Sequence, residues 1–317
     1  MKVITPISIV DNTSIVTSTT NLAEPSGTDP AVWSSGTAYA IGDTATVLAT
    51  HKIYICITAV TGGDSPEVSV TRAIPKWTEH RYTNKYAMFD LKRSAASVFS
   101  AATGSFTLQP GVEVETIAFL GIQDVDTLTV TCTYFNGSTD VTFYAPGTVD
   151  LITRTVTGWY EYFFNPFLQQ KVFIVSGIPS GHSNMKIKVD ITGTTGMQIG
   201  SCIIGNGTRI GALQHGSVSD ALNFSVINRD SFGSISLVKR RSVPKITGTI
   251  AAKKADMAAL VALKKALDAK VALWIGIENS STHPYYEALI IQGFYKEWSF
   301  DLSNPIVPMI NIELEEI

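Results

Sequence analysis

The stretch DTLTVTCTYFNGSTDVTFYAPG (126–147) decides the fold class of this chain. Hydrophobic residues occupy every second position from Leu128 to Tyr134 and alternate with threonines, which is the period of a β-strand with one buried face. Asn136 and Gly137 form a turn signal, and DVTFYA returns as the partner strand. The stretch therefore predicts an antiparallel hairpin that packs one face into a core.

The same composition extends over most of the chain. Thr, Val, Ile and Ser dominate, and glycine or Asn-Gly turns recur at short intervals, which is typical of a mainly β protein. KVFIVSGI (171–178) and MKIKVDITG (185–193) are predicted as further strands of the same β-sandwich. A length of 317 residues with 45% hydrophobic and only 16% charged residues favours two or three folded domains.

One stretch, ADMAALVALKKALDAKVALW (255–274), has helical periodicity. Its apolar residues recur at helical spacing, which predicts a helix over 255–272 packed on a sheet. These apolar residues are Met257, Leu260, Leu263, Leu267, Val271 and Trp274.

The stretch GWYEYFFNPF (158–167) is exceptionally aromatic. As a strand it would carry aromatic rings on both faces, so it would need cover on both sides. One interpretation is a central strand between two layers. The other places Trp159, Tyr160 and Tyr162 in a contact between subunits, because Tyr and Trp are enriched at interfaces.

No catalytic constellation is found. The motifs HExxH, GxSxG and GxxxxGK[ST] are absent, and the five histidines are isolated. The three cysteines, Cys56, Cys132 and Cys202, are scattered without a CxxC pair, so they predict neither a disulfide framework nor zinc. We expect no enzyme activity, no cofactor and no metal.

Charge gives a further site. The net charge of −3 provides no field that would draw nucleic acid, so no sequence-specific nucleic-acid binding is expected. Lys239, Arg240 and Arg241 nevertheless cluster in LVKRRSVPK. They would protect a strand edge or contact an acidic neighbouring subunit. The N-terminal 20 residues resemble neither a signal peptide nor a membrane helix, and no transmembrane segment is expected.

Two resemblances add to this. Trp33, AYAIGD (38–43), KIYICI (52–57), GGDSPE (62–67) and PKW (75–77) resemble the small carbohydrate-binding modules of chitinases. The resemblance implies that exposed aromatic side chains stack on a glycan. The positions concerned are Trp33, Tyr39, Tyr54 and Trp77. In the alternative interpretation Trp33 and Trp77 form the core of the module, since about 50 residues have little else to bury.

The second resemblance covers nearly the whole chain. TNKYAMFD (83–90), RDSFG within FSVINRDSFGSISLVKRRSVPK (224–245), and LWIGIE (273–278) follow one another as in distal-tail-like structural proteins of tailed-bacteriophage tails and baseplates. The resemblance implies a virion component, assembled in the host cytoplasm, that forms a ring with copies of itself and contacts other tail proteins. It implies no reaction.

Together these patterns predict a multidomain, mainly β chain with four parts. They are an N-terminal arm or strand (1–25), a small aromatic β module (26–85), a β-sandwich (86–200), and a tail-tube-like, ring-forming β domain with one flanking helix (201–317). Glu313, Glu315 and Glu316 lie within four residues at the end of the last part. They would line a channel that repels DNA phosphates, or form an ordinary solvated terminus. The alternative function is a receptor-binding protein that binds host cell-surface glycans through the module.

Overall fold

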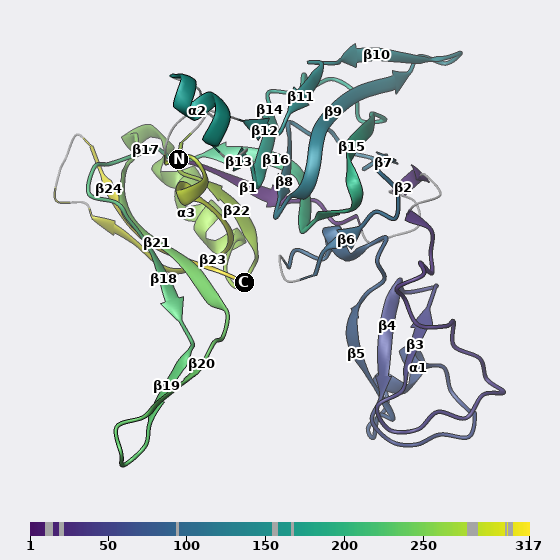
Figure 1. Ribbon diagram of the computed structural model, residues 1–317. Coiled ribbons are helices and arrows are strands. Elements are labelled where there is room, and N and C mark those ends of the chain that lie inside the picture. The colour runs from purple at the N-terminus through teal and green to yellow at the C-terminus, as the bar shows by residue number, and fades with distance from the viewer. Residues whose placement is uncertain are drawn as a thin grey trace. The chain divides into compact units, whose positions relative to one another are not determined.

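The computed structural model describes residues 1–9, 15–18, 22–92, 95–153, 158–165, 168–277, 285–301, 303 and 307–317. The chain is mainly β, as the sequence predicts, with several sheets and few helical segments (Figure 1). It divides into two compact units. Unit 1 comprises Met1–Pro6 and Gly205–Ile317, and unit 2 comprises Ile7–Ile204.

The first layer of unit 2 is an antiparallel sheet. Its strands, in spatial order, are β10 (Asp140–Tyr144), β9 (Gln123–Phe135), β15 (Lys186–Ile199), β7 (Thr103–Leu108) and β2 (Ile15–Ser18), with β11 (Thr148–Asp150) on β9 and β6 (Ser97–Val98) on β15. The hairpin predicted from 126–147 is confirmed, because Asp140 pairs with Phe135 across the turn and Gly137 has a positive φ of 99°.

The second layer of unit 2 covers the inner face of the first. It contains β14 (Val172–Ser176), β8 (Thr116–Leu120) and the first residues of β16 (Ser201–Arg209). Ile117 and Phe119 of β8 pack in one core with Leu128 and Val130 of β9 and with Val189 of β15, all of them buried. The predicted β-sandwich is therefore present. The short helix η2 (Ala87–Phe89) packs against the same core.

The small aromatic module also lies in unit 2. It has three strands, β3 (Thr44–Val47), β4 (Lys52–Cys56) and β5 (Trp77–Tyr82), and a short helix α1 (Pro66–Val70). Its buried core consists of six side chains: Ala45, Val47, Tyr54, Cys56, Val60 and Trp77. With so few apolar groups, each one supports a large share of the module.

Unit 1 is built on one sheet with a helix on it. The strands, in order, are the second part of β16, β1 (Lys2–Pro6), β22 (Ala272–Ile275), β23 (Ile290–Asp301), β24 (Met309–Glu316), β21 (Ser242–Ala251) and β17 (Ala212–Leu213), with β18 (Val218–Asn223) also on β21. Helix α3 (Met257–Ala266) packs Leu260 into the core that contains Trp274 and Trp298. The short helices η3 (Lys254–Asp256) and η4 (Glu287–Leu289) precede α3 and β23.

The helix predicted over 255–272 is too long. Helix α3 ends at Ala266, and Ala269 has a positive φ of 54°, which reverses the chain. Ala272–Ile275 then forms β22, a strand buried on both faces between β1 and β23. A strand that is buried on both faces has apolar residues at successive positions and shows no period of two. In the sequence, the apolar residues of β22 therefore matched the helical spacing of the preceding stretch.

The aromatic stretch is not a strand. Trp159–Phe164 forms the short helix α2, and none of its residues is buried. Pro166 and Phe167 lie outside the described residues. The strands β12 (Ile152–Thr153) and β13 (Leu168–Gln169) pair with each other on either side of this segment. The interpretation as a central strand between two layers is therefore wrong.

Candidate interaction surfaces

The four aromatic residues predicted to stack on a glycan differ in burial. Tyr54 and Trp77 are each only 1% exposed, and the hydroxyl of Tyr54 lies 3.1 Å from the hydroxyl of Thr50. Neither ring presents a face to a sugar, so the prediction is wrong for these two residues. Trp33 and Tyr39 are partly exposed and pack against the module core, with Tyr39 edge-on to Trp77 at a centroid distance of 5.0 Å.

The three glutamates of β24 do not form an unpaired acidic patch. The carboxylate of Glu313 lies 2.8 Å from the ammonium of Lys245, whose hydrogen bond holds the Glu313 pKa below its ordinary value. The carboxylate of Glu315 lies 3.0 Å from the ammonium of Lys296. The side chain of Glu316, 5% exposed, lies 2.6 Å from the guanidinium of Arg241.

The prediction that all three glutamates line a channel is therefore wrong for Glu316, whose side chain is buried. Alternation along β24 places Glu313 and Glu315 on the face opposite the core residues Ile312 and Leu314. Strands β21 and β23 bring their lysines to the same face. Arg241, one residue of the basic cluster, pairs with Glu316 of β24, so this residue does not lie apart from the C-terminal strand.

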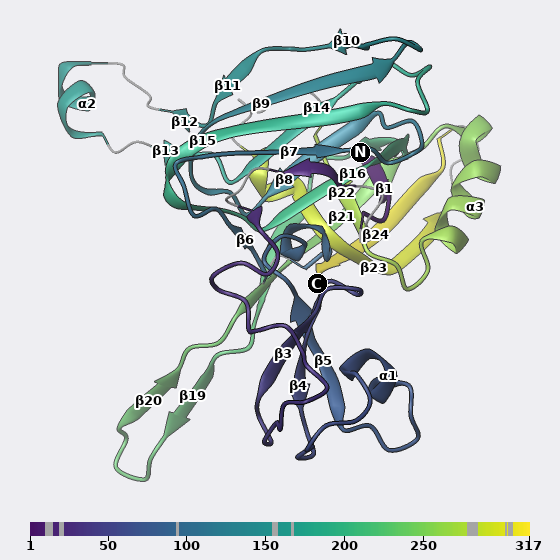
Figure 2. The same cartoon turned by 90° about the vertical axis from the view of Figure 1, so that its right-hand side faces the viewer.

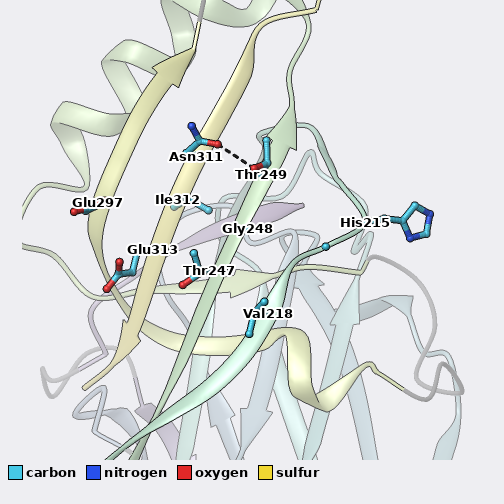
Figure 3. A pocket seen from close by; sticks show the side chains of 10 residues that line it. His215, Val218, Thr247, Gly248, Thr249, Glu297, Asn311, Ile312 and Glu313 are labelled. Carbon is cyan, nitrogen blue, oxygen red and sulfur yellow. Dashed lines mark hydrogen bonds between the residues drawn. The ribbon is translucent and has the colours of Figure 1, made fainter.

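This polar face of the unit 1 sheet contains a cleft of about 280 Å³. Figure 3 shows Glu297 and Glu313 at one side and the Thr249 hydroxyl directed at the Asn311 side chain, a hydrogen bond of 2.9 Å. The His215 ring points away from the other labelled side chains. No acid–base pair is therefore assembled in this cleft.

A second cleft, of about 480 Å³, adjoins the first and shares His215 and Gly216 with it. Its walls are more apolar and include Leu213 of β17, Ile277 and Leu289. We call the two clefts together the edge groove. The sequence does not reveal it, because its residues come from segments as far apart as 213 and 313.

A long hairpin continues the paired strands β18 and β21. It consists of β19 (Val226–Arg229) and β20 (Ile235–Val238) (Figures 1 and 2). Ile227 pairs with Leu237 and Arg229 with Ile235, so these four side chains share one face, and all are exposed. We call it the apolar face of the hairpin. Lys239 and Arg240, predicted as subunit contacts, lie exposed at the base of the hairpin.

Helix α2 presents a second group of exposed rings. Trp159 is 81% exposed, and Tyr160 and Tyr162 are also mostly exposed. Trp159 is roughly parallel to Phe163 at a centroid distance of 6.5 Å, and Tyr160 is tilted against Phe164 at 4.9 Å, so the rings lie next to one another and not in a core. The structure thus brings the three predicted aromatic contact residues to the surface of one short helix.

Within the described ranges, no group of three or more His, Cys, Asp and Glu side chains could hold a metal ion. No helix among the described residues is long and apolar enough to cross a membrane. Comparison with protein-family models, with curated proteins and with solved structures gives no match to this chain. Any functional assignment therefore depends on the sequence motifs and on the geometry of the surfaces above.

Proposed function

We propose that the chain is a structural subunit of a bacteriophage tail or baseplate. It assembles with copies of itself into a ring at the tail tube, alongside other tail or baseplate proteins, in the host cytoplasm before it becomes part of the virion. It carries out no reaction. The sequence motifs described above supply the tail context, and the surfaces of the two units supply the argument for assembly.

The observation that carries this proposal is the hairpin β19–β20. A two-stranded hairpin is marginally stable in water unless something covers its apolar face. Here Ile227, Ile235 and Leu237 on that face are all more than half exposed. Burial of apolar surface contributes roughly 25 cal/mol per Å² removed from water, so a neighbouring copy that covers this face would stabilise both partners.

The polar face of the unit 1 sheet fits the lining of a ring. Glu315, paired with Lys296 outside the edge groove, keeps this face polar toward a passing DNA, whereas Glu313 lies within the groove. The aromatic rings of α2 would serve a different contact, with another tail protein.

A second function, glycan binding by the module, is favoured by one observation. Trp33 and Tyr39 pack against the module core and remain partly exposed, whereas Tyr54 and Trp77 are buried. A receptor-binding role would therefore depend on these two rings. Retention of the protein on a glycan array, lost in a Trp33→Ala variant that melts normally, would support it.

Sedimentation velocity and electron microscopy of the purified full chain test the main proposal. We expect a closed oligomer of several copies with a central hole at micromolar concentrations. A variant in which a Gly-Gly turn replaces residues 226–238 should sediment as a folded monomer. A wild-type chain that remains monomeric over the whole concentration range would refute the proposal.

A further inference from the structure

The tip of the hairpin is a preorganised projection. The carboxylate of Asp230 accepts hydrogen bonds from the backbone N–H of Phe232 at 2.9 Å and of Ser234 at 2.8 Å. Gly233 adopts a positive φ of 85°, which completes the turn. Phe232 is left 93% exposed. A rigid tip that presents one aromatic ring loses little conformational entropy when the ring is buried by a partner.

The edge groove offers a matching receptor. Its apolar cleft of about 480 Å³ lies within the roughly 300–1,000 Å³ range of clefts that enclose small ligands, so a phenyl ring fits in it. Its polar cleft carries Glu297, an exposed carboxylate with no ion pair to any residue that the structure describes. Arg229, three residues before Phe232, likewise has no ion pair within those ranges.

Charge favours another copy of this chain as the partner. Of the 24 basic and 27 acidic residues in the chain, four and one lie within 223–242, which leaves 20 basic and 26 acidic residues elsewhere. The hairpin segment is thus positively charged, and the rest of the chain is negatively charged. A nucleic acid would also attract the basic residues, but it would leave Ile227, Ile235 and Leu237 uncovered.

The hairpin and the edge groove lie at opposite ends of the same paired strands. The hairpin follows Asn223 of β18, whereas the groove is formed around Leu213–Val218 at the other end, near β17 (Figure 1). The hairpin therefore leads away from the groove of its own chain. A contact between different patches of two copies is heterologous, and it closes into a ring when the rotation between copies permits.

We infer that the hairpin tip of each copy docks in the edge groove of the next copy. Phe232 enters the apolar cleft between Leu213 and Leu289, and Arg229 pairs with Glu297. This inference rests on the proposed self-assembly and specifies which surfaces form the contact.

The test measures assembly of full-length variants by sedimentation velocity. Phe232→Ala should weaken association about 30-fold or more, as loss of an aromatic anchor does at an interface. Phe163→Ala, which removes an exposed ring from α2, serves as the matched control and should assemble like the wild type. Circular dichroism and melting curves confirm that each variant is folded.

A charge exchange provides the second arm. Arg229→Glu and Glu297→Arg should each weaken association about tenfold, and the double variant should restore it. If Phe232→Ala assembles into rings as the wild type does, or if the double variant associates as weakly as the single variants, the docking contact is wrong and the proposed assembly still stands. A monomeric wild type would overturn both. If the wild type binds DNA, and Arg229→Glu loses this binding but still forms the ring, the hairpin is a nucleic-acid-binding element and not a subunit contact.

Discussion

Replacement of Trp77 by alanine tests whether this residue supports the fold of the small module or binds a glycan. Trp77 begins β5, where it pairs with Cys56 of β4, and it is 1% exposed. Its ring meets the edge of Tyr39 and the other side chains of the module core. The substitution would therefore open a cavity at the centre of a three-stranded sheet.

The expected cost follows from the size of the core. Truncation of a buried Trp to Ala typically lowers the free energy of unfolding by about 3–5 kcal/mol. The core cluster of the module has six buried side chains, and Trp77 is the largest of them. A loss of that size approaches the whole stability of so small a domain, so we expect the module to unfold while the sandwich of unit 2 remains folded.

Hydrogen exchange measured by mass spectrometry resolves this peptide by peptide. In Trp77→Ala, amides of residues 44–82 should lose protection, and those of 116–135 should keep it. Ile74→Ala, which removes an 84% exposed side chain in the same module, is the control and should change stability by less than about 0.5 kcal/mol. Unchanged protection in Trp77→Ala together with lost glycan retention would refute the structural role.

Three further predictions concern stability. Burial raises the pKa of Asp90 from 3.8 to about 6, so the stability present below its unfolded pKa is lost as the pH rises through about 6. In urea unfolding, the stability of Asp90→Asn should therefore depend less on pH between 3.8 and about 6 than that of the wild type. The hydrogen bond from Lys245 lowers the pKa of Glu313 in the folded state. The ionised carboxylate therefore contributes stability above its unfolded pKa, and this contribution is lost as the pH falls through its folded pKa. The melting temperature of Glu313→Gln should accordingly depend less on pH in the acid range than that of the wild type. A Cβ on Gly293 would clash with the backbone of Glu315, so Gly293→Ala should lower the free energy of unfolding by about 3 kcal/mol or more, whereas Gly27→Ala, which points into open space, should be nearly neutral.

The sequence predicts best where one physical signal dominates. The hairpin of β9 and β10 is confirmed because alternation and an Asn-Gly turn specify the same register. The pattern fails at Trp274, which continues the helical spacing of α3 but belongs to the buried strand β22. Continuous apolar residues suit either element, and only the neighbouring strands β1 and β23 decide between them.

The module shows a different limit. Trp33 and Trp77 stand in the same kind of aromatic motif, yet one is partly exposed and the other is fully buried. The order of residues along a strand tells which side chains share a face, but not which face the helix and loops cover. The sequence leaves open whether Trp77 belongs to the core or stacks on a sugar, and only the folded module distinguishes the two interpretations.

The hairpin shows why interaction surfaces are the hardest features to predict from sequence. Ile227, Ile235 and Leu237 share one face of the paired strands, as core residues of the sandwich strands do, and this pattern alone would place them in a core. They are exposed because both strands extend past the end of the sheet, where unit 1 offers no second layer among its described residues. An apolar strand face that its own unit leaves uncovered is a strong indication that another molecule covers it, since exposure costs free energy at every one of those side chains. The same reasoning applies to helix α2, whose aromatic rings remain 53–81% exposed although they contact one another.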